Sequence, residues 1–334
     1  MCVLVKSRTS QGTMTEQASI TVKSAELIKR STDAISEDSK AKIAQELPLS
    51  RCELDGSEEV CSGECDEEDI IKGEKIFSKL QIDYETPLLN TSMTPKIHFV
   101  VPTSKQDWAF DACSENPDSV QYKISEWCTD RIDDYEDRGL GETFTCSVTS
   151  MPINMMDMEV MRQRKNRVLV LPFFLWIEDL RSDDVESVLD ELVPQLLDGQ
   201  VTREELVKTH PNLTEANEKS FVFICSHMTR DKRCGLTAPY MKRVCDAILK
   251  EHGLYRDASD DTPNGCRVSF INHLGGHKFA GNVQIYLREP RTMIWLGRVT
   301  PIYLPTIFDY LILPETPTLP LPDHVRCIRK YDQW

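Results

Sequence analysis

The chain has 334 residues, which is enough for two ordinary domains with complete hydrophobic cores. Apolar residues make up 40% of it, slightly fewer than in typical soluble domains, so part of the chain is expected to be disordered. The formal charge of −15 argues against binding to nucleic acid or to an anionic membrane. The sequence contains no run of 18 apolar residues, so no membrane-spanning helix is predicted.

Residues 1–69 are predicted to form a disordered acidic tail. The first 52 are rich in Ser, Thr, Lys, Glu and Gln, with a transient helix expected near 22–46, and residues 53–69 contain nine acids and no base. No secretion signal is recognisable, so a cytoplasmic location is expected. A mitochondrial location is the alternative, because Lys6 and Arg8 precede the first acid, Glu16.

Residues 70–215 are predicted to form an N-terminal α/β domain. The segments 97–102 and 167–176 are β-branched and aromatic and predict two buried strands. Ser182 is expected to cap a helix whose apolar face runs from Val185 to Leu196. A diverged thioredoxin-like fold is one interpretation of this domain.

Residues 216–300 predict a second α/β domain. Strands are expected at 221–225 and 266–271, and a helix capped by Thr237 is expected to end at Gly253. A hairpin is expected to join 282–287 to 292–297. Strand, helix, strand, hairpin is the order of a thioredoxin-like fold. Residues 301–334 are interpreted as an extended, exposed, Pro-rich extension.

Twelve cysteines without a secretion signal point to metal or redox chemistry. Six of them are interpreted as core residues, while Cys61 and Cys65 lie in an acidic segment that favours a solvated linker over a redox pair. The six are Cys113, Cys128, Cys146, Cys245, Cys266 and Cys327.

Two segments carry the residues that we expect to bind a metal. Cys225 ends the first strand of the second domain, Cys234 lies just before the predicted helix, and His273 and His277 follow the second strand. Parallel strands should bring all four side chains to one edge of the sheet. Thiolates and imidazoles suit iron–sulfur clusters and zinc, and glycines at 275 and 276 let the backbone pass close to a bulky centre.

The spacing by itself leaves four readings open. Zinc sites usually pair cysteines two to four residues apart, whereas eight residues separate these two. A cluster, a structural zinc site, a thiol–disulfide pair between Cys225 and Cys234, and no site at all remain alternatives. His227 is interpreted as a rival ligand or as a histidine bonded to loop backbone, and Arg230 with Asp231 as a loop ion pair or a docking site for an electron donor.

Together the two segments resemble the sucrase/ferredoxin-like family, most closely its fungal thioredoxin-like ferredoxins. The resemblance rests on the Cys-x8-Cys-Gly stretch from 225 to 235 and on His-x-Gly-Gly-His-Lys-x-Ala-Gly-Asn from 273 to 282, and it covers about 70–334. It implies a [2Fe–2S] cluster with two cysteine and two histidine ligands, which by position are Cys225, Cys234, His273 and His277.

The function implied by this resemblance is electron transfer in cellular redox homeostasis. A reductase system would supply the electrons, and no glycosidase-type carboxylate pair or substrate pocket is identifiable, so a carrier is expected rather than an enzyme. The terminal Asp-Gln-Trp resembles a tripeptide that recruits the cytosolic iron–sulfur assembly machinery, through Trp334. The rival reading is a zinc-stabilised interaction module or a thiol–disulfide oxidoreductase on the same fold.

Overall fold

The computed structural model describes residues 24–51, 67–132, 135, 144–257, 260, 262–273 and 275–331. Cys61, Cys65 and Trp334 lie outside these ranges. No helix within them is long and apolar enough to cross a membrane.

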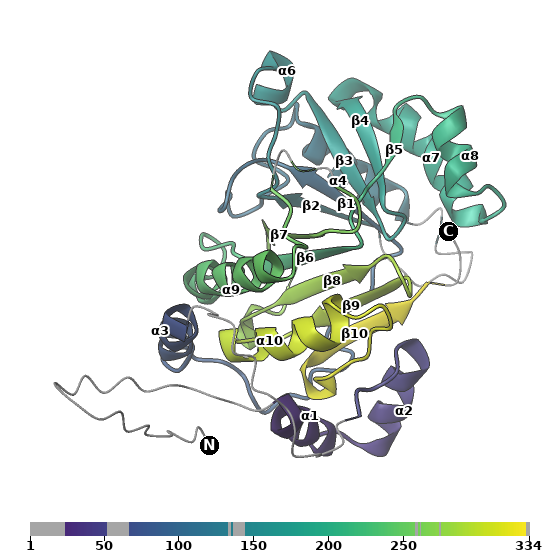
Figure 1. Ribbon diagram of the computed structural model, residues 1–334. Coiled ribbons are helices and arrows are strands. Elements are labelled where there is room, and N and C mark those ends of the chain that lie inside the picture. Colours follow the sequence, from purple (N-terminus) through teal and green to yellow (C-terminus); the bar gives the residue numbers. More distant parts are fainter. Residues whose placement is uncertain are drawn as a thin grey trace.

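The chain combines strands and helices, as predicted for an α/β protein (Figure 1). The strands are β1 Ile97–Pro102, β2 Phe144–Thr149, β3 Lys165–Leu171, β4 Leu175–Arg181, β5 Leu213–Glu215, β6 Ser220–Cys225, β7 Cys266–Ile271, β8 Val283–Leu287, β9 Thr292–Leu296 and β10 Val325–Lys330. The α-helices are α1 Ser24–Asp33, α2 Glu37–Glu46, α3 Glu67–Phe77, α4 Val120–Asp130, α6 Met158–Met161, α7 Val185–Asp198, α8 Arg203–Thr209, α9 Lys232–Glu251 and α10 Leu304–Ile307.

The ten strands of the described residues belong to one sheet with the order β10-β9-β8-β6-β7-β2-β1-β3-β4-β5. Within it, β1 and β2 are parallel, as are β6 and β7, and the other pairings are antiparallel. A helix connects each parallel pair, α4 in the first half and α9 in the second. The two halves therefore repeat one topology, which is compatible with the expected thioredoxin-like arrangement.

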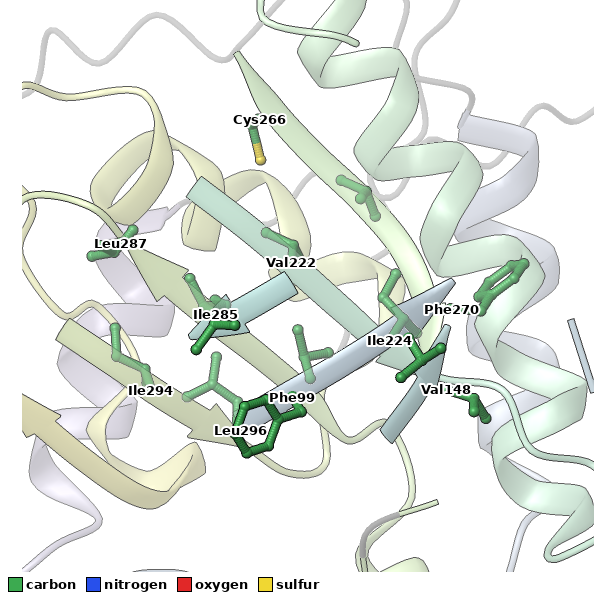
Figure 2. Packing of buried hydrophobic residues seen from close by; sticks show 14 of the residues in the cluster. Phe99, Val148, Val222, Ile224, Cys266, Phe270, Ile285, Leu287, Ile294 and Leu296 are labelled. Atoms are coloured by element: carbon green, nitrogen blue, oxygen red, sulfur yellow. The ribbon is translucent and has the colours of Figure 1, made fainter. Parts of the chain in front are cut away.

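The halves meet where β2 pairs with β7 through Thr149 and Ile271. One hydrophobic cluster nevertheless extends across both, and Figure 2 shows members from β1 and β2, such as Phe99 and Val148, together with members from β6 to β9. On another face, His98 of β1 hydrogen-bonds Tyr286 of β8 at 2.8 Å. The predicted core cysteines are buried or packed against these clusters.

The run 167–176 does not form a single strand. It divides into β3 and β4 at the turn Pro172–Phe174, where Phe174 has a φ of 53°. Proline has no amide hydrogen to donate to a neighbouring strand, and a residue in the left-handed conformation allows the chain to reverse. The apolar run therefore forms parts of two antiparallel strands.

Two segments expected to be disordered or exposed are packed instead. In residues 24–51, α1 and α2 place Ile28 and Ile43 in buried positions. In the C-terminal segment, β10 pairs with β9 and extends the sheet, so that Val325 and Arg326 are buried. Its prolines precede the strand or cap short turns, where a missing amide hydrogen costs little.

Candidate metal centre

The four predicted ligands converge at one end of β6 and β7. Cys225 is the last residue of β6, and it pairs in register with Ile271, the last residue of β7. His273 follows two residues later, and His277 opens a short 3-10 turn, His277–Phe279. Because the two strands are parallel, their carboxyl ends share an edge and bring the loops together.

Three of the ligand atoms face one another. The sulfurs of Cys225 and Cys234 and a ring nitrogen of His273 all lie within 4.8 Å of one another, and Cys225 Sγ is 3.6 Å from His273 Nδ1. His277 lies beside this group, with its Nδ1 3.3 Å from Nε2 of His273. The structure therefore brings together Cys225, Cys234 and His273, and places His277 next in the row.

Burial changes steadily along that row. Both cysteines are buried, His273 is half-buried, and His277 is exposed. A group held by the sulfurs would be shielded from water, while its histidine side would reach the surface.

The two thiols sit too close together for both to ionise unaided. The hydrogen bond with Cys225 raises the pKa of Cys234 well above its usual range, and burial and the charge of Cys225 act in the same direction. A cationic metal centre reverses this balance, because it binds the thiolate form and releases the protons.

His277 is biased toward the neutral ring that ligates metals. Its partial burial lowers its pKa, as do the charges of His273, Arg233 and Arg230.

Helix α9 begins at Lys232, several residues before the predicted cap at Thr237. Asp231 is the N-cap, and its carboxylate accepts a hydrogen bond from the backbone N–H of Arg233 at 2.9 Å. Thr237 instead donates its hydroxyl to the Arg233 carbonyl. Cys234 is thus held in the first turn of a helix, where the helix dipole opposes the rise in its pKa without reversing it.

His227 is not a ligand in this arrangement. Its Nε2 donates to the backbone carbonyls of Trp108 and Ala109 at 3.1 and 2.9 Å, and its Nδ1 accepts from the backbone N–H of His273. Both ring nitrogens are occupied, so His227 positions the histidine loop.

The expected ion pair between Arg230 and Asp231 is absent from the described residues. Asp231 pairs with Arg233 at 2.7 Å, because the cap geometry turns its carboxylate toward the helix. The guanidinium of Arg230 stacks on the ring of Phe110 at 3.9 Å from its centroid.

Sequence reasoning missed Arg326, a residue of β10 that is only 2% exposed. Its guanidinium donates to the Gly275 carbonyl at 3.1 Å and to Oδ1 of Asn282 at 2.9 Å, which ties β10 to the histidine loop. No carboxylate of the described residues forms an ion pair with it. Burial lowers its pKa, whereas the charges of Cys327, Cys225 and Cys234 oppose that shift. The apolar residues Val325, Cys327 and Ile328 were the available sequence signal for this strand, obscured by the neighbouring prolines.

One glycine of the histidine loop has a role that the sequence did not predict. Gly276 has a φ of 75°, and a Cβ at this position would overlap the Arg326 guanidinium. Gly275 has a φ of 104° with open space around it. Gly276 therefore allows the buried cation to approach the loop backbone.

The surroundings fit an anionic, sulfur-rich group. A buried cation without a carboxylate is costly unless another anion balances it, and the cysteine charges that act on Arg326 are those of Cys327, Cys225 and Cys234. A cavity of about 10 Å³ beside Cys225 is lined by Gln284 and Trp295, whose side-chain N–H groups have no partner within the described residues. A cavity of this size has room for about one water molecule, which would satisfy such donors.

The chain is similar in sequence to known proteins. The chain is 57% identical over 300 residues to Actin patches distal protein 1 of Saccharomyces cerevisiae, which covers 90% of this chain and 95% of that protein. Over 97 residues it is 36% identical to Altered inheritance of mitochondria protein 32 of Debaryomyces hansenii, covering 28% of this chain and 32% of that relative.

No solved structure matches the chain. The sequence model of one family, described as sucrase/ferredoxin-like, matches residues 88–327 and so includes all four predicted ligands. By this match and by its near full-length similarity to the yeast protein, the chain belongs to the sucrase/ferredoxin-like family.

Proposed function

We propose that this chain is a one-electron carrier that holds a [2Fe–2S] cluster through Cys225, Cys234, His273 and His277. The observation that carries the proposal is the group of three donors within 4.8 Å, backed by a buried arginine that no described carboxylate neutralises. Soft thiolates and neutral imidazoles are the donors that such a cluster accepts.

When bound, the cluster supplies a centre that accepts and releases a single electron. Neutral imidazoles in place of two thiolates make the site less negative and favour a higher potential than all-cysteine ligation. The charge of Arg326 acts in the same direction, since it stabilises added negative charge. His277 carries the exposed end of the site and exchanges protons with water there.

The cellular setting belongs to the same proposal. We expect a cytoplasmic protein that takes electrons from a reductase system and receives its cluster from the cytosolic assembly machinery through Trp334. Deleting Trp334 should lower the fraction of cluster-loaded protein in cells, and an unchanged fraction would contradict the recruitment.

Spectroscopy of the purified protein tests the proposed cofactor. We expect visible bands that bleach with dithionite and an EPR signal whose average g-value indicates mixed His and Cys ligation. Cys225→Ala should abolish the bands and His273→Ala or His277→Ala should shift them, whereas His252→Ala, at the exposed end of α9, should leave them unchanged. A colourless protein with one zinc per chain would refute the proposal.

A further inference from the structure

Exposed apolar and cationic side chains gather around the start of α9, close to the candidate ligand Cys234. The apolar ones are Phe110, Met228 and Leu236, which are 61%, 42% and 43% exposed. Arg230 and Lys232 are exposed beside them. We refer to these five residues as the site rim.

Contacts join the rim into one surface. Arg230 stacks on Phe110 and donates to its backbone carbonyl at 3.3 Å. Met228 packs so closely over Gly235 that a Cβ there would overlap it, and Leu236 is the next residue of α9. Arg230 also lies close enough to His277 for its charge to act on that ring.

The rim is cationic although the chain carries a net charge of −15. Neither Arg230 nor Lys232 forms an ion pair with a carboxylate in the described part of the chain. Nearby, Arg233 is neutralised by Asp231 and Lys278 by Asp83, at 2.7 and 2.9 Å. The rim therefore holds two cations without an ion-pair partner among the described residues, and one carboxylate beside it, that of Asp107, accepts from the Thr229 hydroxyl at 2.7 Å.

We propose that the site rim docks an acidic electron-transfer protein. This inference rests on the proposed function, because it places the partner at the histidine side of the same centre. Arginine, methionine and an aromatic ring are the residue types enriched at interfaces. The local positive charge attracts an acidic patch, while the negative remainder of the chain repels it and so restricts the docking orientation.

Small ions of opposite charge test the local field. The reduced, cluster-loaded protein gives one electron to ferricyanide, a trianion, or to tris(phenanthroline)cobalt(III), a trication. If the rim is the exchange site, added salt should slow the reaction with ferricyanide and accelerate the reaction with the cobalt complex, despite the net negative charge. If added salt instead accelerated the reaction with ferricyanide and slowed the reaction with the cobalt complex, the proposal would be overturned.

A matched pair of variants locates the charge. Lys232→Gln should slow ferricyanide reduction roughly two- to fivefold at low salt, because one positive charge near the site is lost. Lys208→Gln makes the same change on α8, beside the far edge strand β5, and should leave the rate unchanged. Equal rates for both variants would contradict the proposal.

Cross-linking tests whether a protein docks there. Plant-type ferredoxin serves as the acidic probe, and a carbodiimide joins its carboxylates to lysines in contact. We expect mass spectrometry to find cross-links at Lys232 and Lys278, and fewer of them with Leu236→Ser. Cross-links at Lys208 with none at Lys232 would overturn the docking site. If the purified parent protein lacked the visible bands, the proposed cluster would be refuted. Failure of the proposed function can therefore be distinguished from failure of the proposed docking site.

Discussion

Arg326 combines a permanent positive charge with almost complete burial. Its guanidinium lies 4.6 Å from the centroid of the Trp295 ring, and among the described residues it donates only to neutral oxygens, from Thr91, Gly275 and Asn282. Neutral partners satisfy its hydrogen bonds but leave its charge uncompensated. A reduced metal centre next to it would gain the most from that charge.

Arg326→Met should therefore make the midpoint potential of the loaded protein more negative, because the added electron loses electrostatic stabilisation. A redox titration followed by visible absorbance measures the shift. Arg329→Met, on the same strand, is the control and should leave the potential near that of the parent protein. A fully loaded Arg326→Met protein with an unchanged or higher potential would contradict this role.

At the scale of elements, the cap of α9 links helix formation to the ligand geometry. The Asp231 carboxylate accepts a hydrogen bond from a backbone N–H of the first turn, in which Cys234 lies. Its counterpart in the other half is Ser119, which caps α4 by accepting from the N–H of Tyr122. The two caps occupy equivalent places in the repeated topology, but only one of them stands next to a candidate ligand.

Replacing either cap by alanine should lower the free energy of unfolding by about 1 kcal/mol. Asp231→Ala should also lower the iron content per chain, because the first turn that holds Cys234 loosens, whereas Ser119→Ala should not. Urea unfolding and iron analysis of the two variants measure both effects. Equal iron content would show that the cap does not position the cysteine.

For the whole molecule, His98 is a buried link between the halves. Its Nδ1 bonds Tyr286 of β8 and its Nε2 bonds Ser147 of β2, at 2.8 and 2.7 Å. Burial lowers the pKa of His98 to about 3. The unfolded chain binds a proton at about pH 6.5, so between these values it holds more protons than the folded protein, and stability falls as the pH falls.

His98 should therefore contribute a loss of about 2 kcal/mol in the free energy of unfolding between pH 7 and pH 5. His98→Phe should be less stable at pH 7, since it leaves two hydroxyls without a partner, but should lose less on acidification. Tyr286→Phe removes a hydrogen bond and keeps the titrating ring, so its pH dependence should match the parent. Urea titrations at both pH values measure the free energy of unfolding. If His98→Phe lost as much of it between pH 7 and pH 5 as the parent protein does, the prediction would be refuted.

The strands at 97–102, 221–225 and 266–271 could be predicted because each is a short, continuous apolar run between polar residues. The start of α9 could not, because Thr237 and Pro239 form an equally good helix start and only the Asp231 carboxylate contact decides between them. The C-terminal strand β10 escaped prediction since its burial depends on pairing with β9, which local composition does not reveal.

The sequence by itself determined the α/β class and the choice of Cys225, Cys234, His273 and His277, because donor chemistry and strand periodicity are properties of residue type and spacing. Only the tertiary structure decided that three of these donors converge, that His227 holds backbone rather than metal, and that Arg326 lies behind the site. Those outcomes depend on contacts between segments distant in the chain, where burial and the balance of charge are set by neighbours that no local pattern specifies.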